Sequence, residues 1–190
     1  MKKTIIIFGF SGSGKTTMAK RLSKNLKLRL IHPSGILRAI CLGGDWKKYQ
    51  KLSNRGFWEN EVGRKILQAR LAKDTPPDKL CDEIILKEAR KSDVVIDSWS
   101  LPWIFQGGLK IYLRASLKTR ANRVARRSNE EYQKTRRLVW QKDRDTRFLY
   151  QRISGFDIAK DHEVFDLIIN TENLSKEEVE EKILSYVKNY

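Results

Sequence analysis

The chain has 190 residues, with 39 Lys and Arg against 23 Asp and Glu and a formal net charge of +16 at neutral pH. This length suits one compact domain, and no apolar segment approaches the roughly 20 residues that a membrane-spanning helix needs, which excludes an integral membrane protein. The first ten residues run directly into a glycine-rich loop, so a cleavable signal peptide is excluded too, and we expect a cytoplasmic protein.

The positive charge is concentrated in two parts of the chain. Residues 1–44 contain nine Lys or Arg and no acid, and residues 110–152 contain fourteen against four acids. This distribution favours a polyanionic ligand, either the phosphates of a nucleotide or the backbone of RNA or DNA. The cysteines and histidines lack metal-ligand spacing, so we assign none of them a metal role.

The first predicted element is a short buried strand over residues 4–8, which ends at a glycine-rich loop. Gly9, Gly14, Lys15 and Thr16 fit the pattern G-x-x-x-x-G-K-T, and an amphipathic helix follows. Glycine lets successive N–H groups of such a loop turn inward, which makes an anion site at the positive end of the helix. The loop therefore predicts a site for the phosphates of a nucleoside triphosphate.

Two side chains of this loop have predicted chemical roles. Lys15 is expected to reach the β- and γ-phosphates, and the Thr16 hydroxyl to ligate a Mg²⁺ ion that bridges them. The predicted ATP-binding residues are Gly9, Ser11, Gly12, Ser13, Gly14, Lys15, Thr16 and Thr17. ATP and Mg²⁺ are therefore the predicted cofactors.

Further apolar runs predict four more buried strands, over residues 28–31, 93–97, 109–113 and 165–170. Helical patterns lie between them, and this alternation predicts an α/β fold with a five-stranded parallel sheet and helices on both faces. Such sheets bind ligands beyond the carboxyl ends of their strands. Asp97 stands at such an end, and we expect it to coordinate Mg²⁺ indirectly.

Two regions interrupt the alternation. Residues 34–77 are helical in pattern and predict an inserted subdomain on the substrate side. Residues 114–152 predict two cationic helices with a break near residues 128–129, followed by two capping acids. The C-terminal segment predicts a helix that begins after Ser175 as its N-cap.

These elements resemble the P-loop nucleoside monophosphate kinases, and the second half of the chain is most similar to the short cytidylate kinases of archaeal type. The resemblance extends from the first strand nearly to the C-terminus. It is carried by the loop at 9–17 and by the segments "SGILR" at 34–38, "DVVID" at 93–97 with Trp103 beyond it, "LRASLKTRANRVARR" at 113–127 and "SGFDIAKDHEVFDLIINTENLSKEEV" at 154–179.

The resemblance implies a P-loop NTPase fold with a helical acceptor-binding insertion and a helical lid, all within one kinase domain over residues 1–190. The implied parts are a core at 1–33, 78–127 and 153–190, an acceptor-binding helical region at about 34–77, and a basic lid at about 114–152.

It also implies roles for several side chains. In the family, an arginine after the second strand holds the phosphate of the acceptor nucleotide, and Arg38 stands at that place, with Ser34 and Trp99 as further acceptor-binding candidates. The predicted lid arginines are Arg120, Arg123 and Arg127, with Arg144 and Arg147 in a second cluster. The predicted catalytic residues are Lys15, Arg123, Arg127 and Asp97, because phosphoryl transfer depends mainly on charge neutralisation.

The chain departs from the family's pattern on the acceptor side. Ser34 replaces a usual glycine, and Asp97, Ser98 and Trp99 stand where acid, glycine and arginine are expected. Trp99 and Trp103 either stack on a base or fill the core. The departures leave the identity of the acceptor open.

Our first hypothesis is ATP-dependent phosphoryl transfer to a nucleoside monophosphate, CMP or dCMP. A monophosphate oxygen is already anionic near pH 7, so the reaction needs arginine clamps but no general base. One alternative is a kinase that acts on a hydroxyl of a nucleoside or of an RNA or DNA end, with Asp97 as the base. Another is an ATP-switched RNA-binding assembly factor. The expected partners are nucleotide substrates, with RNA as a further candidate and no membrane, and the expected oligomeric state is a monomer.

Overall fold

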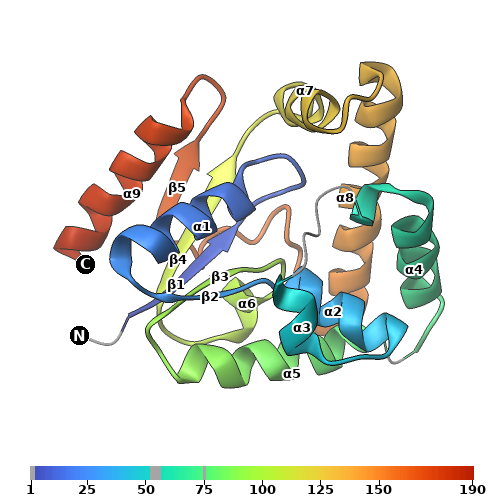
Figure 1. Cartoon of the computed structure of the whole chain (residues 1–190), viewed down its shortest axis with the longest axis horizontal. Helices are drawn as coiled ribbons and strands as arrows, with labels where there is room; N and C mark the ends of the chain where they lie inside the picture. The colour runs from blue at the N-terminus through green and yellow to red at the C-terminus, as the bar shows by residue number, and fades with distance from the viewer. Residues whose placement is uncertain (1–2, 52–56, 75) are drawn as a thin grey trace.

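The computed structural model describes residues 3–51, 57–74 and 76–190 (Figure 1). Its strands are β1 (Thr4–Phe8), β2 (Arg29–Ile31), β3 (Val94–Asp97), β4 (Leu109–Arg114) and β5 (Leu167–Asn170). They form a parallel sheet in the order β2-β3-β1-β4-β5, which confirms the predicted sheet. The predicted start of the last strand was two residues early, because the Phe165 N–H donates to the His162 carbonyl within a turn.

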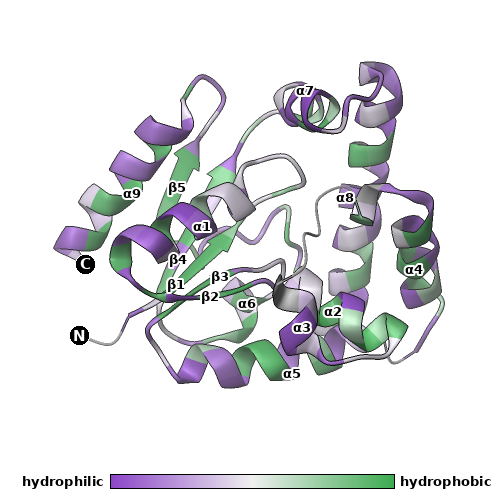
Figure 2. Cartoon of the chain, viewed as in Figure 1, coloured by the Kyte–Doolittle hydropathy of each residue, from purple (hydrophilic) through white to green (hydrophobic). Residues whose placement is uncertain are grey.

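Helices cover both faces of the sheet, as predicted (Figure 1). They are α1 (Lys15–Leu26), α2 (Pro33–Leu42), α3 (Trp46–Lys51), α4 (Glu61–Leu71), α5 (Pro77–Arg90), α6 (Leu101–Ile104), α7 (Leu117–Ser128), α8 (Tyr132–Ser154) and α9 (Lys176–Asn189), with a 3₁₀ turn η1 (Phe57–Glu59). Figure 2 shows hydrophobic strands covered by helices whose residues alternate between hydrophobic and hydrophilic. No described helix is long and apolar enough to cross a membrane.

The central strand β1 shows why the sheet is buried on both sides. Side chains alternate along a strand, so Ile5 and Ile7 pack against α1 and α9, whereas Ile6 packs against α2 and α5. Phe8 belongs to a third, aromatic cluster that includes Tyr150 of α8. Each of these β1 side chains is at most 1% exposed, so the sequence there is a continuous apolar run.

The predicted helix boundaries in the basic region are confirmed. Asn129 adopts a left-handed conformation with φ of 52° and ends α7 at the predicted break, a conformation that asparagine tolerates better than most residues. The Glu131 carboxylate then accepts from the first N–H groups of α8. At the C-terminus, Ser175 and Glu178 form a reciprocal capping box that starts α9.

The region predicted to be helical over residues 34–77 contains α2, α3, η1 and α4, and residues 52–56 and 75 of it lie outside the described residues. Figure 1 shows α4 beside α8, with α7 near the upper end of α8. These helices stand beyond the carboxyl edge of the sheet, where the glycine-rich loop leaves β1. The fold therefore surrounds that edge with side chains from distant parts of the chain.

Candidate active site

The loop between β1 and α1 has the backbone that its motif predicts. Gly12 has φ of +82°, and a Cβ there would lie 2.5 Å from the Arg120 carbonyl oxygen, so a larger residue does not fit. Gly14, with φ of +103°, is the N-cap of α1. The described residues offer no hydrogen-bond partner to the buried hydroxyls of Ser11 and Ser13. Together these features leave polar groups of the loop at the positive end of α1.

Lys15 is desolvated within this loop. Its ammonium donates to the Gly9 carbonyl and lies 4.6 Å from the centre of the Trp99 ring. Burial lowers the pKa of Lys15 to about 8; the charge of Asp97 opposes this shift, and the charge of Lys142 adds to it. A buried cation of this kind gains most from an anionic ligand, because water no longer screens its charge.

Asp97, at the carboxyl end of β3, lies against the loop. Its Oδ2 accepts from the Thr16 hydroxyl at 2.7 Å, and its Oδ1 lies 2.8 Å from His32 Nδ1. The part of the chain that the structure describes contains no group of three or more His, Cys, Asp and Glu that could hold a metal. A hydroxyl and one nearby carboxylate nevertheless fit Mg²⁺, which takes few protein ligands and completes its shell with phosphates and water.

A cavity of about 330 Å³ adjoins the loop, and Arg123 and Arg127 of α7 line it together with the segment that follows β5. Arg123 donates to the carbonyl of Thr171 and, at 3.0 Å, to its hydroxyl, so α7 is tied to the end of β5. Arg127, one turn further along α7, is exposed. Two predicted catalytic arginines are thus brought to the same cavity as Lys15, Thr16 and Thr17.

Arg120 lies behind the loop and not over its cavity. It is 8% exposed, and its guanidinium donates to the Ser11 carbonyl at 2.9 Å and to the Asp143 carboxylate of α8. The other oxygen of Asp143 accepts from the Ser11 N–H at 3.2 Å. The structure therefore places Arg120 in a buried ion pair that holds the loop against α7 and α8.

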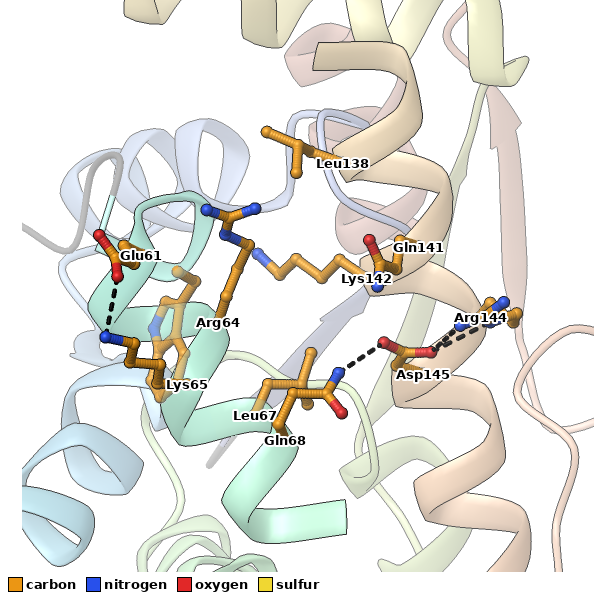
Figure 3. Close-up of a pocket in the computed structure, with 11 residues that line it drawn as sticks. Glu61, Arg64, Lys65, Leu67, Gln68, Leu138, Gln141, Lys142, Arg144 and Asp145 are labelled. Carbon is orange, nitrogen blue, oxygen red and sulfur yellow. Dashed lines mark hydrogen bonds and ion pairs between the residues drawn. The ribbon is translucent and has the colours of Figure 1, made fainter. Parts of the chain in front are cut away.

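A second and larger cavity, of about 590 Å³, lies between α4 and α8 (Figure 3). Arg64 of α4 and Lys142 of α8 extend into the space between the two helices from opposite walls. Further along the same helices, Gln68 donates to Asp145 across the cavity at 3.3 Å. The volume falls in the usual range for small-molecule sites, and its lining combines cations, one buried carboxylate and apolar side chains.

The predicted acceptor residues Arg38, Ser34 and Trp99 differ in how they are related to these cavities. Arg38 of α2 stacks on the Phe57 ring at 4.0 Å, Phe57 contacts the Trp58 ring, and Trp58 lines the α4–α8 cavity. Arg38 Nε is buried and has no partner among the described residues. Ser34 lies half-buried in the first turn of α2. Trp99 packs edge-on against Phe8 and Phe10 beside Lys15, so it fills the aromatic cluster.

The second predicted lid cluster is divided between two places. Arg144 lines the α4–α8 cavity, donates to Asp145 and lies 5.0 Å from the Trp140 ring. Arg147 instead pairs with Asp157, in the segment that follows α8. The structure therefore brings Arg144 to a cavity, whereas Arg147 is occupied in holding the end of α8.

Several residues that line the α4–α8 cavity or support the loop were not predicted from the sequence. The cavity residues are Trp58, Arg64, Gln68, Lys142 and Asp145, and the supporting residues are His32 and Asp143. The sequence held a signal for two of them, Asp143 and Asp145. Residues 110–152 contain fourteen basic residues and only four acids, and these two are among the four. An acid retained in so basic a segment is a candidate for a buried partner. His32 gave no such signal, because its partner is 65 residues away.

Comparison with protein families places this chain in a known group. Residues 4–173 match the model of the Cytidylate kinase-like family. A cytidylate kinase of Ignicoccus hospitalis is 30% identical over 183 residues, which cover 94% of this chain and 95% of the relative. A cytidylate kinase of Pyrobaculum aerophilum is 32% identical over 177 residues, which cover 90% of this chain and 85% of the relative.

Solved structures with the same fold are more distant in sequence. An uncharacterized protein from Eubacterium ventriosum covers 100% of both chains with a TM-score of 0.67 and 14% identity. Shikimate kinase from Acinetobacter baumannii, in complex with shikimate, gives a TM-score of 0.54 at 17% identity and covers 100% of this chain and 94% of its own. At such identities the likeness concerns the fold alone, and that fold is the predicted P-loop kinase fold.

Proposed function

The chain belongs to the cytidylate kinase-like family, and we propose that it transfers the γ-phosphoryl group of ATP to a nucleoside monophosphate, with CMP or dCMP as the preferred acceptor. The observation that carries this proposal is the presence of cations in two separate cavities. Lys15 and Arg123 line the loop cavity, and Arg64 and Lys142 line the α4–α8 cavity. Two cationic cavities suit two ligands that both carry phosphates.

On the donor side, ATP occupies the loop cavity in this proposal. Lys15 neutralises the β- and γ-phosphates, and Arg123 and Arg127 contribute charge from α7. Thr16 would hold Mg²⁺ directly and Asp97 indirectly, and the ion would supply positive charge that offsets the charge of the phosphates. The loop N–H groups at the start of α1 bind the remaining oxygens.

On the acceptor side, the monophosphate lies between α4 and α8, with its phosphate between Arg64 and Lys142. Two like charges that extend into one space repel, and an anion between them turns that repulsion into attraction. Arg38 adds a third cation nearby, with its buried Nε. No general base is needed, because the attacking phosphate oxygen is already anionic.

The alternative of a hydroxyl acceptor finds less support. It requires Asp97 as a base, whereas the proposal places Asp97 at the Mg²⁺ site beside Thr16, and the relatives that match most of the chain are cytidylate kinases. The division into core, acceptor-binding region and lid belongs to the proposal. RNA binding, a monomeric state and a cytoplasmic location remain predictions from the sequence.

The experiment that tests the proposal is phosphoryl transfer from γ-labelled ATP with Mg²⁺ to CMP, dCMP, UMP, AMP, cytidine and a 5′-hydroxyl RNA oligomer. We expect label in a diphosphate, strongest with CMP or dCMP, and none with the Lys15→Ala variant. Label in cytidine or the oligomer would replace the proposal with a hydroxyl kinase. Absence of label from every acceptor would contradict kinase activity and favour the RNA-binding factor.

A further inference from the structure

We infer that Asp145 and Gln68 select the base of the acceptor, with the Asp145 carboxylate accepting the exocyclic amino group of cytosine and disfavouring uracil. The inference rests on the proposed function, because it assumes that a nucleoside monophosphate occupies the α4–α8 cavity. It goes beyond that function by naming the residues that discriminate between two pyrimidines of nearly equal size.

Asp145 is a carboxylate with one committed oxygen and one available oxygen. Its side chain is 8% exposed, and its Oδ1 accepts from Nε and Nη2 of Arg144 at 3.1 and 2.9 Å. Its Oδ2 accepts from Gln68 at 3.3 Å, which is longer than an ordinary N–H···O bond. A carboxylate oxygen has two lone pairs, so Oδ2 keeps capacity for a stronger donor.

The Gln68 bond also shows where Oδ2 is directed. Gln68 lies on α4 and Asp145 on α8, so the bond crosses the cavity from one wall to the other (Figure 3). A ligand between these helices therefore meets Oδ2 together with the Gln68 amide. The amide carries both a donor and an acceptor, whereas the carboxylate only accepts.

The two ends of the cavity match the two ends of a nucleotide. Arg64 and Gln68 are four residues apart on α4, a rise of about 6 Å, and Lys142 and Asp145 are three residues apart on α8, a rise of about 4.5 Å. The cations Arg64 and Lys142 lie at one level of the cavity, and the Gln68 amide and the Asp145 carboxylate, whose Oδ1 is paired with Arg144, lie at the next. A phosphate bound between the cations leaves the base next to Gln68 and Asp145.

Apolar groups also line the cavity. Leu67 and the Trp58 ring line it, and both present surfaces on which a flat pyrimidine packs. The buried Trp58 Nε1 has no hydrogen-bond partner among the residues that the structure describes. A buried indole N–H is rarely left without an acceptor, which is a second indication of a polar ligand at this wall.

Cytosine and uracil differ where Asp145 can sense them. Cytosine carries an amino donor at C4, and uracil carries a carbonyl acceptor there, as does thymine. A carboxylate facing the amino group gains a charge-assisted hydrogen bond. Facing a carbonyl oxygen, the same carboxylate is repelled and loses water without compensation. The buried charge of Asp145 therefore favours CMP over UMP.

The test compares kcat/KM for CMP and for UMP in the wild type, Asp145→Asn and Asp145→Glu. Asparagine keeps the size of the side chain but presents an amide donor, so we expect the CMP-to-UMP ratio to fall at least about tenfold. Asp145→Glu keeps the carboxylate and should retain a preference for CMP. The matched control is Glu130→Gln, which removes one charge just before α8, at an exposed position outside the cavity.

Equilibrium binding of CMP and UMP without ATP gives the same ratio independently of catalysis. The inference is overturned if Asp145→Asn leaves both ratios within about twofold of the wild type, or if Glu130→Gln changes them equally. If the wild type phosphorylates no monophosphate, the proposed function fails, and the ratio of dissociation constants then decides on Asp145 by itself. An unchanged ATP affinity in Asp145→Asn would confirm that the loop cavity is intact.

Discussion

The two cavities of this kinase are built in different ways. The loop cavity, which we assign to ATP, is formed around nine consecutive residues, 9–17, that join the central strand to its helix, with α7 and the segment after β5 on its other side. The α4–α8 cavity, which we assign to the acceptor, has walls from two helices whose sequences begin about seventy residues apart. A short stretch of sequence therefore defines the first site, whereas packing between distant helices defines the second.

The polar networks that support the cavities differ in the same sense. On the ATP side, Asp143 and Arg120 bond to the loop backbone itself at Ser11. On the acceptor side, Arg70 at the end of α4 pairs with Asp78 at the start of α5 at 2.5 and 2.9 Å. That pair positions a helix and not a ligand-binding backbone. Changes on the ATP side should therefore affect the reaction with every acceptor. Changes on the acceptor side should affect some acceptors more than others.

The largest expected effect is that of Lys15→Ala. Loss of the buried ammonium removes charge from the β- and γ-phosphates, and we expect kcat to fall on the order of 10³-fold for all acceptors alike. Steady-state kinetics with CMP and UMP would measure it, with Lys20→Ala, an exposed lysine of the same helix, as the control. A loss confined to one acceptor would contradict the division between the two sides.

Much of the ATP side could be predicted from the sequence because its determinants are local. The strand at 4–8, the loop at 9–17 and the cap at Ser175 all depend on neighbours within a few residues. The spacing of Arg120 and Arg127 indicates that they share one helix face. It does not indicate that Arg120 is buried and Arg127 exposed. Arg120 is buried because α8 and the loop close over the first turn of α7, and such a contact leaves no mark in a periodic pattern.

The acceptor side could be predicted only as a helical region. Arg64 and Gln68 look like the exposed face of an amphipathic helix, and both are indeed exposed. Their proposed role depends on α8, which brings Lys142 and Asp145 opposite them. The buried carboxylate of Asp145 was the strongest available hint, because an acid in so basic a segment indicates a fixed partner.

The second prediction concerns Arg70→Met, which tests how α4 is held. The buried Asp78 would lose its partner, so we expect a loss of about 3–5 kcal/mol in the free energy of unfolding. Urea unfolding would measure it. The double variant with Asp78→Asn should recover part of the loss, since it removes the unpaired charge. Equal stability of single and double variants would show that packing, not charge, dominates there.

The third prediction separates the two sides in kinetics. Arg64→Ala and Lys142→Ala each remove one cation from the α4–α8 cavity, and we expect the KM for CMP to rise about tenfold. For Lys142→Ala, the pKa of Lys15 should also rise, because a nearby like charge is removed. Lys79→Ala, an exposed change on α5, is the control. An equal rise in the KM for ATP with Arg64→Ala would contradict the assignment of that cavity to the acceptor.

The smallest expected effect is a pH dependence of stability from Asp82, a buried residue of α5. Burial raises the pKa of Asp82 to about 7, although the Ser100 hydroxyl donates to its carboxylate and opposes the shift. Between about pH 4 and 7 the folded chain holds a proton that the unfolded chain has lost. The stability that this proton contributes is complete below about pH 4 and is lost as the pH rises through 7.

Asp82→Asn should therefore make the chain more stable at pH 8, by part of the roughly 4 kcal/mol that so large a rise in pKa represents, and flatten this part of the pH profile, because the amide keeps an acceptor for Ser100 without the buried charge. Chemical unfolding at pH 5, 6, 7 and 8 would show it. Glu83→Gln, one residue further along α5 and exposed, removes an equal charge from solvent and should leave the profile unchanged. An equal change in the pH profile of both variants would mean that the net charge of the chain, and not the burial of Asp82, causes the pH dependence of stability.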